Sequence, residues 1–248
     1  QWVISGQKVW TSRGPYSRWG MCLARTDPEQ VKHKGLTMIA VDMEGPGVEV
    51  RPLHQMNGDT HFCEVFVDGA RVGTDDILGG ENAGWGVAMA VLAHERASLG
   101  GSGGGLDPSG GYRWLEQLRE LGAFDHPARR DRAMRLYAEQ RTAAWTAARM
   151  ARASETGGDT GSGGSGGKLR LVRVYKERTS LLKDAQGPAG TLTGDGHVEF
   201  LTGPSMSIRG GTDEVQRNII GERILGLPPE PRVDKGVSYA DLRRQGLT

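Results

Sequence analysis

The sequence predicts an α+β chain, in which a small antiparallel β-barrel or sandwich domain precedes an α-helical up-down bundle. Two observations support this fold class. Residues 1–78 contain short apolar segments separated by turn signals, which is typical of small antiparallel β-domains. From Gly84 onward the apolar residues recur at helical spacing instead. A chain of 248 residues is long enough for one large domain or two modest ones.

The β-half begins with a predicted hairpin, in which residues 2–4 and 9–11 form strands on either side of Ser5–Lys8. Turn signals at Glu44–Gly47 and at Asp68–Gly69 separate later apolar segments. Further strands are therefore expected at residues 21–24, 36–41, 48–50 and 62–67.

The second half predicts a series of helices. In the first of them Val87, Ala90, Val91 and His94 share one face. A long helix places Met134, Tyr137, Trp145 and Ala148 on one side, and its many arginines are expected to form a solvated face. The predicted helices span residues 83–99, 128–153, 168–184, 197–206 and 213–225.

Two glycine-rich stretches, at residues 100–111 and 157–167, interrupt the bundle and are expected to be flexible linkers. Neither is a nucleotide-binding fingerprint. The first follows a helix rather than a strand. The second has Ser162 where a phosphate loop has its first glycine, and Leu169 where it has Ser or Thr.

Composition excludes several classes of function. The formal net charge of +1 provides no electrostatic reason to expect nucleic acid or an anionic membrane as a partner. No apolar run is long enough for a membrane span. Cys22 and Cys63 cannot build a disulfide framework, so a reduced, cytoplasmic location is expected. The spacing of the cysteines and histidines predicts no metal site. Because Gln1 opens directly on a strand-like pattern, the chain is interpreted as a fragment of a longer protein.

Three separated segments carry distinctive motifs. They are Gly6–Gly14, which leads to Trp19; Gln55–Val67, which leads to Gly80–Trp85; and Ile208–Arg223. In this order they resemble the acyl-CoA dehydrogenase family of flavoenzymes. The third motif and the arginine-rich composition are similar to those of actinobacterial members, some of which act on steroid side chains.

The resemblance implies a domain organisation. The family has an N-terminal helical domain, a middle β-domain and a C-terminal four-helix bundle. Residues 1–80 correspond to part of the β-domain, which binds flavin and acyl-CoA, and residues 81–230 to the bundle. Residues 231–248 are expected to be a C-terminal tail. The N-terminal domain and the start of the β-domain are expected to be missing.

The implied reaction removes two hydrogens from the Cα–Cβ bond of an acyl-CoA, with FAD as cofactor and a carboxylate as base. Many family members have the catalytic Glu at the position of Gly210, which has no side chain to act as a base. A minority place it on the first bundle helix before an Arg, as in Glu95-Arg96, so Glu95 is the candidate base. Arg96 and Arg209 are candidate substrate-binding residues. An ordinary exposed Glu–Arg pair is the alternative for Glu95.

Gly210 remains a candidate through its backbone N–H, which is able to polarise the thioester carbonyl. A glycine there also permits a positive φ. The alternative is that Gly210 is only part of the turn before the last bundle helix.

The flavin site is implied by further matches. Trp10 and Ser12 match an aromatic residue beside the isoalloxazine and a hydroxyl near N5, with Thr11 between them as a backbone contact. The alternative for Trp10 is a core tryptophan. Thr212 is predicted as an N-cap, and the resemblance places Thr212 and Glu214 beside the FAD diphosphate and ribityl region.

A second set of contacts concerns the FAD adenine from a neighbouring subunit. Gly187 and Gly190 match the family's glycine turn, although Pro188 replaces one glycine and Asp184 stands where Gln is common. The family's Arg-x-Phe-Gly segment is not recognisable between residues 113 and 135. A basic residue from the 129–141 region is expected to replace it.

The resemblance also implies partners: an acyl-CoA substrate, an electron-transfer flavoprotein or similar acceptor, and assembly into homo- or hetero-oligomers, as dimers or tetramers. A bulky, branched or long acyl group is favoured. Three alternatives stay open: an acyl-CoA oxidase-type flavoenzyme, a non-catalytic subunit of a heteromeric dehydrogenase, and a fragment with no activity alone.

Overall fold

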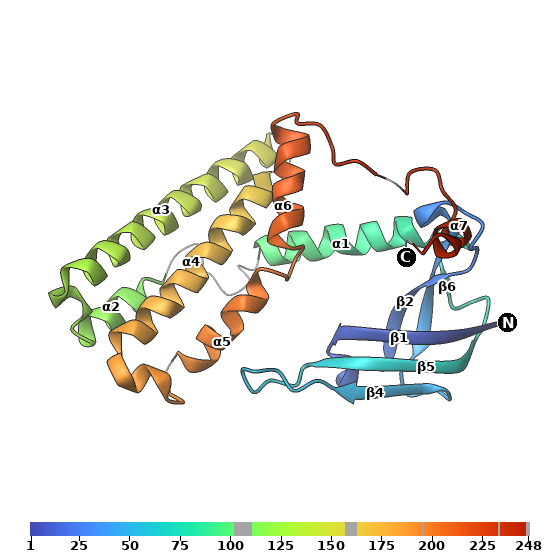
Figure 1. Ribbon diagram of the computed structural model, residues 1–248, viewed down its shortest axis with the longest axis horizontal. Coiled ribbons are helices and arrows are strands. Elements are labelled where there is room, and N and C mark those ends of the chain that lie inside the picture. Colours follow the sequence, from blue (N-terminus) through green and yellow to red (C-terminus); the bar gives the residue numbers. More distant parts are fainter. Residues whose placement is uncertain (102–110, 157–162, 195, 233, 247–248) are drawn as a thin grey trace. The chain divides into compact units, whose positions relative to one another are not determined.

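The chain divides into two compact units (Figure 1), one formed by Gln1–Arg96 with Pro231–Thr248 and the other by Ala97–Glu230. The predicted fold class is confirmed, because antiparallel sheets are followed by a set of helices. Among the described residues, no helix is both long and apolar enough to cross a membrane. The computed structural model describes residues 1–101, 111–156, 163–194, 196–232 and 234–246, with the backbone alone at 93, 95–101, 154 and 163.

The first unit contains two three-stranded antiparallel sheets (Figure 1). Ile39 and Val41 from one sheet and Val72 from the other form one buried cluster, so the core lies between the sheets. A second cluster contains Met43, Cys63 and Val65. One sheet has the order β1 (Trp2–Ser12), β5 (Phe62–Val72) and β4 (Val48–Pro52), and the other β2 (Trp19–Arg25), β3 (Leu36–Asp42) and β6 (Ile77–Leu78).

The predicted N-terminal hairpin is wrong, because β1 is one strand. It pairs antiparallel with β5 over its whole length, from Trp2 opposite Val72 to Ser12 opposite Phe62. The residues expected to form a turn are absorbed by irregularities between Ile4 and Gly6 and between Lys8 and Thr11. A partner strand as long as β1 supplies hydrogen bonds across both bulges, which outweighs the local turn preference.

The C-terminal segment, residues 231–246, belongs to the first unit and contains a short helix, α7 (Tyr239–Arg244). Ser238 caps this helix by accepting a hydrogen bond from the Asp241 amide at 3.1 Å. Ser238 also forms a β-bridge with Val31. The sequence pattern does not predict α7, because a helix this short has no detectable periodicity.

The second unit is built from helices around one buried cluster that includes Trp114, Leu118, Ala133, Leu136 and Leu181. The indole of Trp114 donates to Gln140 Oε1 at 3.0 Å, which satisfies a buried polar pair inside the bundle. Its helices are α2 (Arg113–Glu120), α3 (Pro127–Glu155), α4 (Gly163–Ala185), α5 (His197–Met206) and α6 (Asp213–Ile219), and α1 (Gly84–Gly101) precedes them.

Several helix predictions need correction. Helix α2 was not predicted. Helix α4 begins at Gly163, within the stretch expected to be a linker, because Ser165 is already buried and packing outweighs the weak helix propensity of glycine. Residues 102–110 and 157–162 of the two predicted linkers lie outside the described residues. The helix predicted over residues 213–225 consists of two parts: α6, which ends at Ile219, and a π-helical turn over Ile220–Ile224.

The long helix α3 also differs in its faces. Its buried residues are Ala133, Leu136 and Gln140, whereas Met134 and Trp145 are exposed in this chain. The buried face therefore consists mainly of small or aliphatic side chains that pack against α2 and α4.

Candidate functional site

Trp10 lies near the end of β1 and projects into solvent. Its side chain is 62% exposed, so the core-tryptophan alternative is wrong. Its backbone has φ of 61°, in the left-handed region that bulky residues rarely adopt. The ring meets Phe62 edge-on, with ring centroids 5.9 Å apart. Strained residues of this kind concentrate at binding sites, so the exposed indole is available to stack against a planar ligand.

The residues after Trp10 are locked by the adjacent strand. The Cys63 thiol donates to the Thr11 carbonyl at 3.4 Å, and the Arg13 amide donates to the His61 carbonyl at 2.7 Å. A Cβ on Gly14 would lie 2.2 Å from Cys63 Sγ, so only glycine fits there. Ser12 is exposed beside this turn. The segment predicted to hold the flavin is thus rigid in its backbone and open in its side chains.

Burial raises the pKa of the Cys63 thiol, and the backbone hydrogen bond from Gly14 only partly offsets this effect. The thiol therefore stays protonated near neutral pH and acts as a structural donor. It is not a nucleophile candidate.

Helix α1 carries Glu95 and Arg96, whose side chains lie outside the described part of the structure. The start of the helix is well defined. A Cβ on Gly84 would lie 2.3 Å from the Met38 amide nitrogen, so the helix begins in close backbone contact with β3. The candidate base Glu95 therefore lies on a helix whose first residue is held in close contact with strand β3.

In the second unit, Gly210 and Gly211 form the turn that leads into α6. Their φ angles are 64° and 89°, which confirms that glycine permits a positive φ here. A Cβ on Gly210 would meet nothing within 4 Å, whereas one on Gly211 would lie 2.6 Å from Gln216 Nε2. Gln216 donates to the Gly210 carbonyl at 3.2 Å and holds the turn in place.

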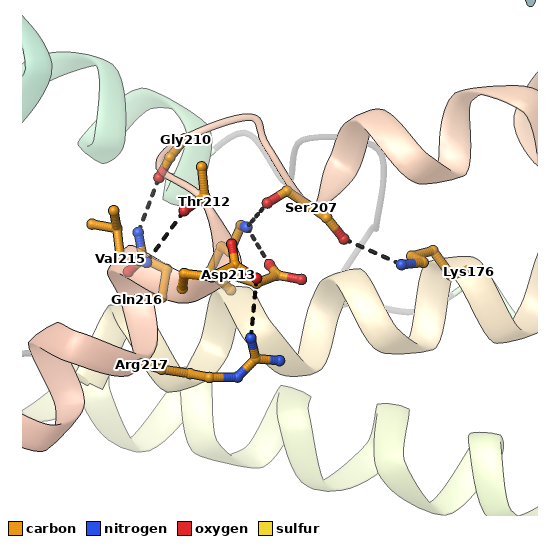
Figure 2. A network of polar contacts seen from close by, with 10 residues as sticks. Lys176, Ser207, Gly210, Thr212, Asp213, Val215, Gln216 and Arg217 are labelled. Atoms are coloured by element: carbon orange, nitrogen blue, oxygen red, sulfur yellow. Dashed lines mark hydrogen bonds and ion pairs between the residues drawn. The ribbon is translucent and has the colours of Figure 1, made fainter.

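Thr212 is the N-cap of α6, as predicted, since its hydroxyl accepts from the Val215 amide at 3.2 Å (Figure 2). The next residue, Asp213, accepts from Lys168 Nζ at 2.6 Å. Lys168 also donates to the Ser207 carbonyl at 3.2 Å. Lys176 approaches Ser207 from the other side, with its Nζ 3.2 Å from the hydroxyl oxygen (Figure 2).

This network changes the acidity of Asp213. Burial alone would raise the pKa of its carboxyl, but the hydrogen bonds from Lys168 and Ser207, together with the positive charges of Lys168 and Arg217, outweigh burial and lower the pKa below its ordinary value. Both side chains of the Lys168–Asp213 pair are 16% exposed. The neighbouring Glu214 is exposed and pairs with Arg217 at 3.4 Å. The acidic side chains at the start of α6 are therefore neutralised by local cations.

The glycine turn after α4 forms a short 3-10 helix over Gly187–Thr191. Gly187 has φ of 60°, which favours glycine, and a Cβ on Gly190 would lie 2.3 Å from the Lys183 carbonyl oxygen, so Gly190 has no room for a side chain. Asp184, just before the turn, pairs with Arg132 at 2.9 Å.

Several arginines of α3 form ion pairs or a cation–π contact, in addition to facing solvent. Arg132 bridges Asp184 and Glu177 of α4, and Arg135 pairs with Asp131 within α3. Arg141 lies over the Trp145 ring, 5.2 Å from its centroid. One basic residue from the 129–141 region is expected to replace a missing flavin contact, and most of the arginines in this region already have partners in this chain. Arg209 lies in the exposed turn between α5 and α6.

The predicted site residues fall into two groups. Trp10, Thr11 and Ser12 lie in the first unit, with the backbone of Glu95 and Arg96. The second unit contains Gly187, Gly190, Arg209, Gly210, Thr212 and Glu214. The described residues contain no cluster able to hold a metal ion.

Sequence reasoning missed three supporting contacts: Phe62 beside Trp10, Lys168 beside Asp213, and the partners of Lys176. Lys168 and Asp213 are separated by 45 positions, so no local pattern links them.

Comparison with known proteins gives a consistent result. The family model described as "Acyl-CoA dehydrogenase, middle domain" matches residues 1–70, and that described as "Acyl-CoA dehydrogenase, C-terminal domain" matches residues 82–225. The chain is 38% identical over 228 residues to acyl-CoA dehydrogenase FadE34 and 37% identical over 250 residues to acyl-CoA dehydrogenase IpdE1, both from Mycobacterium tuberculosis. These matches cover 92% and 94% of this chain but only 31% and 61% of the two relatives.

Solved structures agree. The Tcur3481-Tcur3483 steroid ACAD matches with a TM-score of 0.78 and 25% identity, over 92% of this chain and 61% of that one. A chain of the ChsE4-ChsE5 complex from Mycobacterium tuberculosis matches with a TM-score of 0.74 and 27% identity, over 92% of this chain and 62% of that one.

Proposed function

This chain belongs to the acyl-CoA dehydrogenase family, and we propose that it is the flavin-binding and base-bearing part of an enzyme that introduces a double bond between Cα and Cβ of an acyl-CoA. The observation that carries this proposal is the exposed indole of Trp10, held in a left-handed backbone conformation next to Ser12. Residues in sparsely populated backbone conformations cluster at binding and catalytic sites, and an exposed aromatic ring there offers a flat surface for a planar ligand.

The residues present fit FAD. Trp10 offers an open ring face, and Ser12 offers an exposed hydroxyl two positions away. At α6, Lys168 and Arg217 neutralise Asp213 and Glu214, so these carboxylates would not repel a diphosphate beside Thr212. Gly187 and Gly190 would contribute to the adenine side of FAD in a second copy or in a related subunit. Bound FAD supplies the acceptor for the hydride that leaves the β-carbon.

The chain's own residues perform the other parts of the reaction. Glu95 takes the proton from the α-carbon, and Arg96 orients either this carboxylate or the substrate. The Gly210 amide donates to the thioester carbonyl oxygen, which makes the α-proton more acidic. Gly210 has no side chain, and a Cβ there would meet nothing within 4 Å. The position of the candidate base on the first bundle helix favours a bulky or branched acyl group, with Arg209 as a contact to the substrate.

Flavin binding is tested by incubating the chain with FAD, desalting it and recording the visible absorption spectrum. We expect retained flavin for the natural chain and loss for Trp10→Ala. Trp19→Ala is the matched control, because Trp19 is also exposed, at 59%, in the same unit. Equal flavin retention by both variants would contradict the role of Trp10.

The chemistry is tested by anaerobic bleaching of the flavin with acyl-CoA thioesters, a steroid side-chain thioester being compared with octanoyl-CoA. We expect bleaching to be faster with the bulky thioester and to disappear in Glu95→Gln. Electrons would then pass to an electron-transfer flavoprotein or a similar acceptor. Unchanged bleaching in Glu95→Gln would exclude Glu95 as the base.

A second function is a non-catalytic subunit of a heteromeric dehydrogenase. Gly210 favours it, because many relatives carry their base at this position. A similar protein is part of the ChsE4-ChsE5 complex, which is formed by two differently named proteins. Under this hypothesis the assembled enzyme turns over equally well with Glu95→Gln in this chain, whereas the first proposal requires it to lose activity.

A further inference from the structure

Two aromatic rings stack at the start of helix α1. Trp85 lies in the first turn of this helix, and His33 lies in the 3-10 turn Lys32–Gly35 that joins β2 to β3. The ring centroids are 3.8 Å apart, and the ring planes are inclined by only 6°. The rings are therefore in face-to-face contact, although His33 is exposed and Trp85 is 36% exposed. Burial alone does not explain an exposed stack of this kind.

The residues just before Trp85 are held through the backbone. Ala83 forms a β-bridge with Leu36, and the Asn82 amide donates to Thr37 Oγ1 at 2.8 Å. Asn82 Oδ1 in turn accepts from Thr26 Oγ1 at 2.8 Å. These bonds fix where α1 begins. The stack of Trp85 on His33 adds a side-chain contact in the first turn of α1, just after these bonds. A second point of contact of this kind restrains the angle at which the helix axis leaves the sheet.

The turn that carries His33 is itself held by the C-terminal segment. Lys32 pairs with Asp234, with 2.5 Å between Nζ and Oδ2. The Tyr239 amide donates to the Gln30 carbonyl at 3.1 Å, and the Ala240 amide donates to the Pro28 carbonyl at 2.9 Å. The segment thus contacts the chain immediately before His33 through both backbone and side chains. All these residues belong to the first unit.

We propose that the His33–Trp85 stack, held by the C-terminal segment, is a positioning device for helix α1 and hence for Glu95. The inference rests on the proposed role of Glu95 as the base. Glu95 lies ten positions after Trp85 on the helix, about 15 Å along the axis. A tilt of about 5° at the stack would move a point that far along by about 1.3 Å, and a displacement of about 1 Å is enough to lower a catalytic rate about 100-fold.

The test compares His33→Ala with His33→Phe in the full chain loaded with FAD. Phenylalanine keeps a flat ring for the stack, whereas alanine removes it. Three quantities are measured: hydrogen–deuterium exchange in a peptide covering residues 84–94, flavin content, and kcat and KM with an acyl-CoA. Glu95→Gln is measured in parallel.

We expect His33→Ala to raise exchange in residues 84–94 about two- to tenfold, as loss of one aromatic pair implies. We expect kcat to fall by about ten- to 100-fold, with KM and flavin content nearly unchanged, because binding groups are not touched. His33→Phe should restore both exchange and kcat. A merely structural role would lower flavin content and kcat together and would not separate kcat from KM.

The outcomes separate this inference from the proposed function. Unchanged exchange in His33→Ala overturns the inference, whatever the activity. The inference is also overturned if His33→Ala increases exchange but leaves kcat unchanged, while Glu95→Gln abolishes activity. The helix would then move without affecting the base. If Glu95→Gln is as active as the unsubstituted chain, the proposed function is overturned instead. Exchange in His33→Ala still tests whether the stack holds the helix.

The contribution of the C-terminal segment has its own test. Lys32→Glu and Asp234→Lys each place like charges together, and both should raise exchange in residues 84–94 and in α7. The double variant reverses the pair and should restore protection in both regions. If the single variants leave residues 84–94 unchanged, the C-terminal segment does not hold the stack.

Discussion

Replacement of Lys168 by methionine removes the cation at the start of α6 while keeping most of the side-chain volume. Lys168 donates to Asp213 at 2.6 Å and to the Ser207 carbonyl at 3.2 Å. A hydrogen bond to a charged group contributes about 1.5–3 kcal/mol. Because both partners of the ion pair are 16% exposed, solvent screens part of this interaction. We therefore expect Lys168→Met to lower the free energy of unfolding of the second unit by about 2 kcal/mol.

The assay is thermal unfolding followed by circular dichroism, combined with hydrogen exchange in α4 and α6. A loss of about 2 kcal/mol corresponds to a Tm lower by roughly 5–10 °C for a unit of this size. Lys176→Met is the matched control, since Lys176 lies on the same helix and contacts the same Ser207 but is exposed. The reasoning is refuted if Lys168→Met costs no more than Lys176→Met, or if only helices remote from α6 lose protection.

Three further predictions concern stability. Since its surroundings lower the pKa of Asp213 in the folded chain, its contribution to stability is present above the ordinary Asp pKa of about 3.9 and is lost as pH falls through the lower folded value; acid titrations of unfolding free energy should be less steep for Asp213→Asn in this range. Thr212→Ala should cost about 1 kcal/mol through loss of the N-cap, whereas Thr212→Ser should cost little; equal denaturation midpoints would contradict the cap. Arg13 has φ of 57°, so Arg13→Asn should stabilise the first unit by about 0.5 kcal/mol, measured as a higher Tm, because asparagine adopts this conformation more readily.

Local sequence patterns predicted the features that depend on neighbouring residues. The change from short apolar segments to helical periodicity correctly divided the chain into β-structure and helices. Thr212 before an acidic first turn predicted the N-cap of α6, because a cap depends only on residues within one helical turn. The glycine at position 210 indicated a positive φ for the same local reason.

Features that depend on distant pairing were not predictable in this way. Residues 5–8 resemble a turn, yet β1 continues through them because β5 supplies hydrogen bonds along the whole strand. The stack of His33 on Trp85 joins residues from a turn and a helix, and neither has a local signal for the other. The C-terminal segment was expected to be a tail, but it forms α7 and bonds to Pro28–Lys32.

The sequence by itself determined the fold class, the family resemblance and the identity of the candidate residues, because motifs and periodicities are written in consecutive positions. Only the tertiary structure decided that Trp10 is exposed and strained, that Asp213 is neutralised by Lys168, and that the turn carrying His33 is held from the C-terminus. The physical reason is that exposure, charge pairing and ring stacking depend on which residues meet in space, and those contacts join positions far apart in the chain.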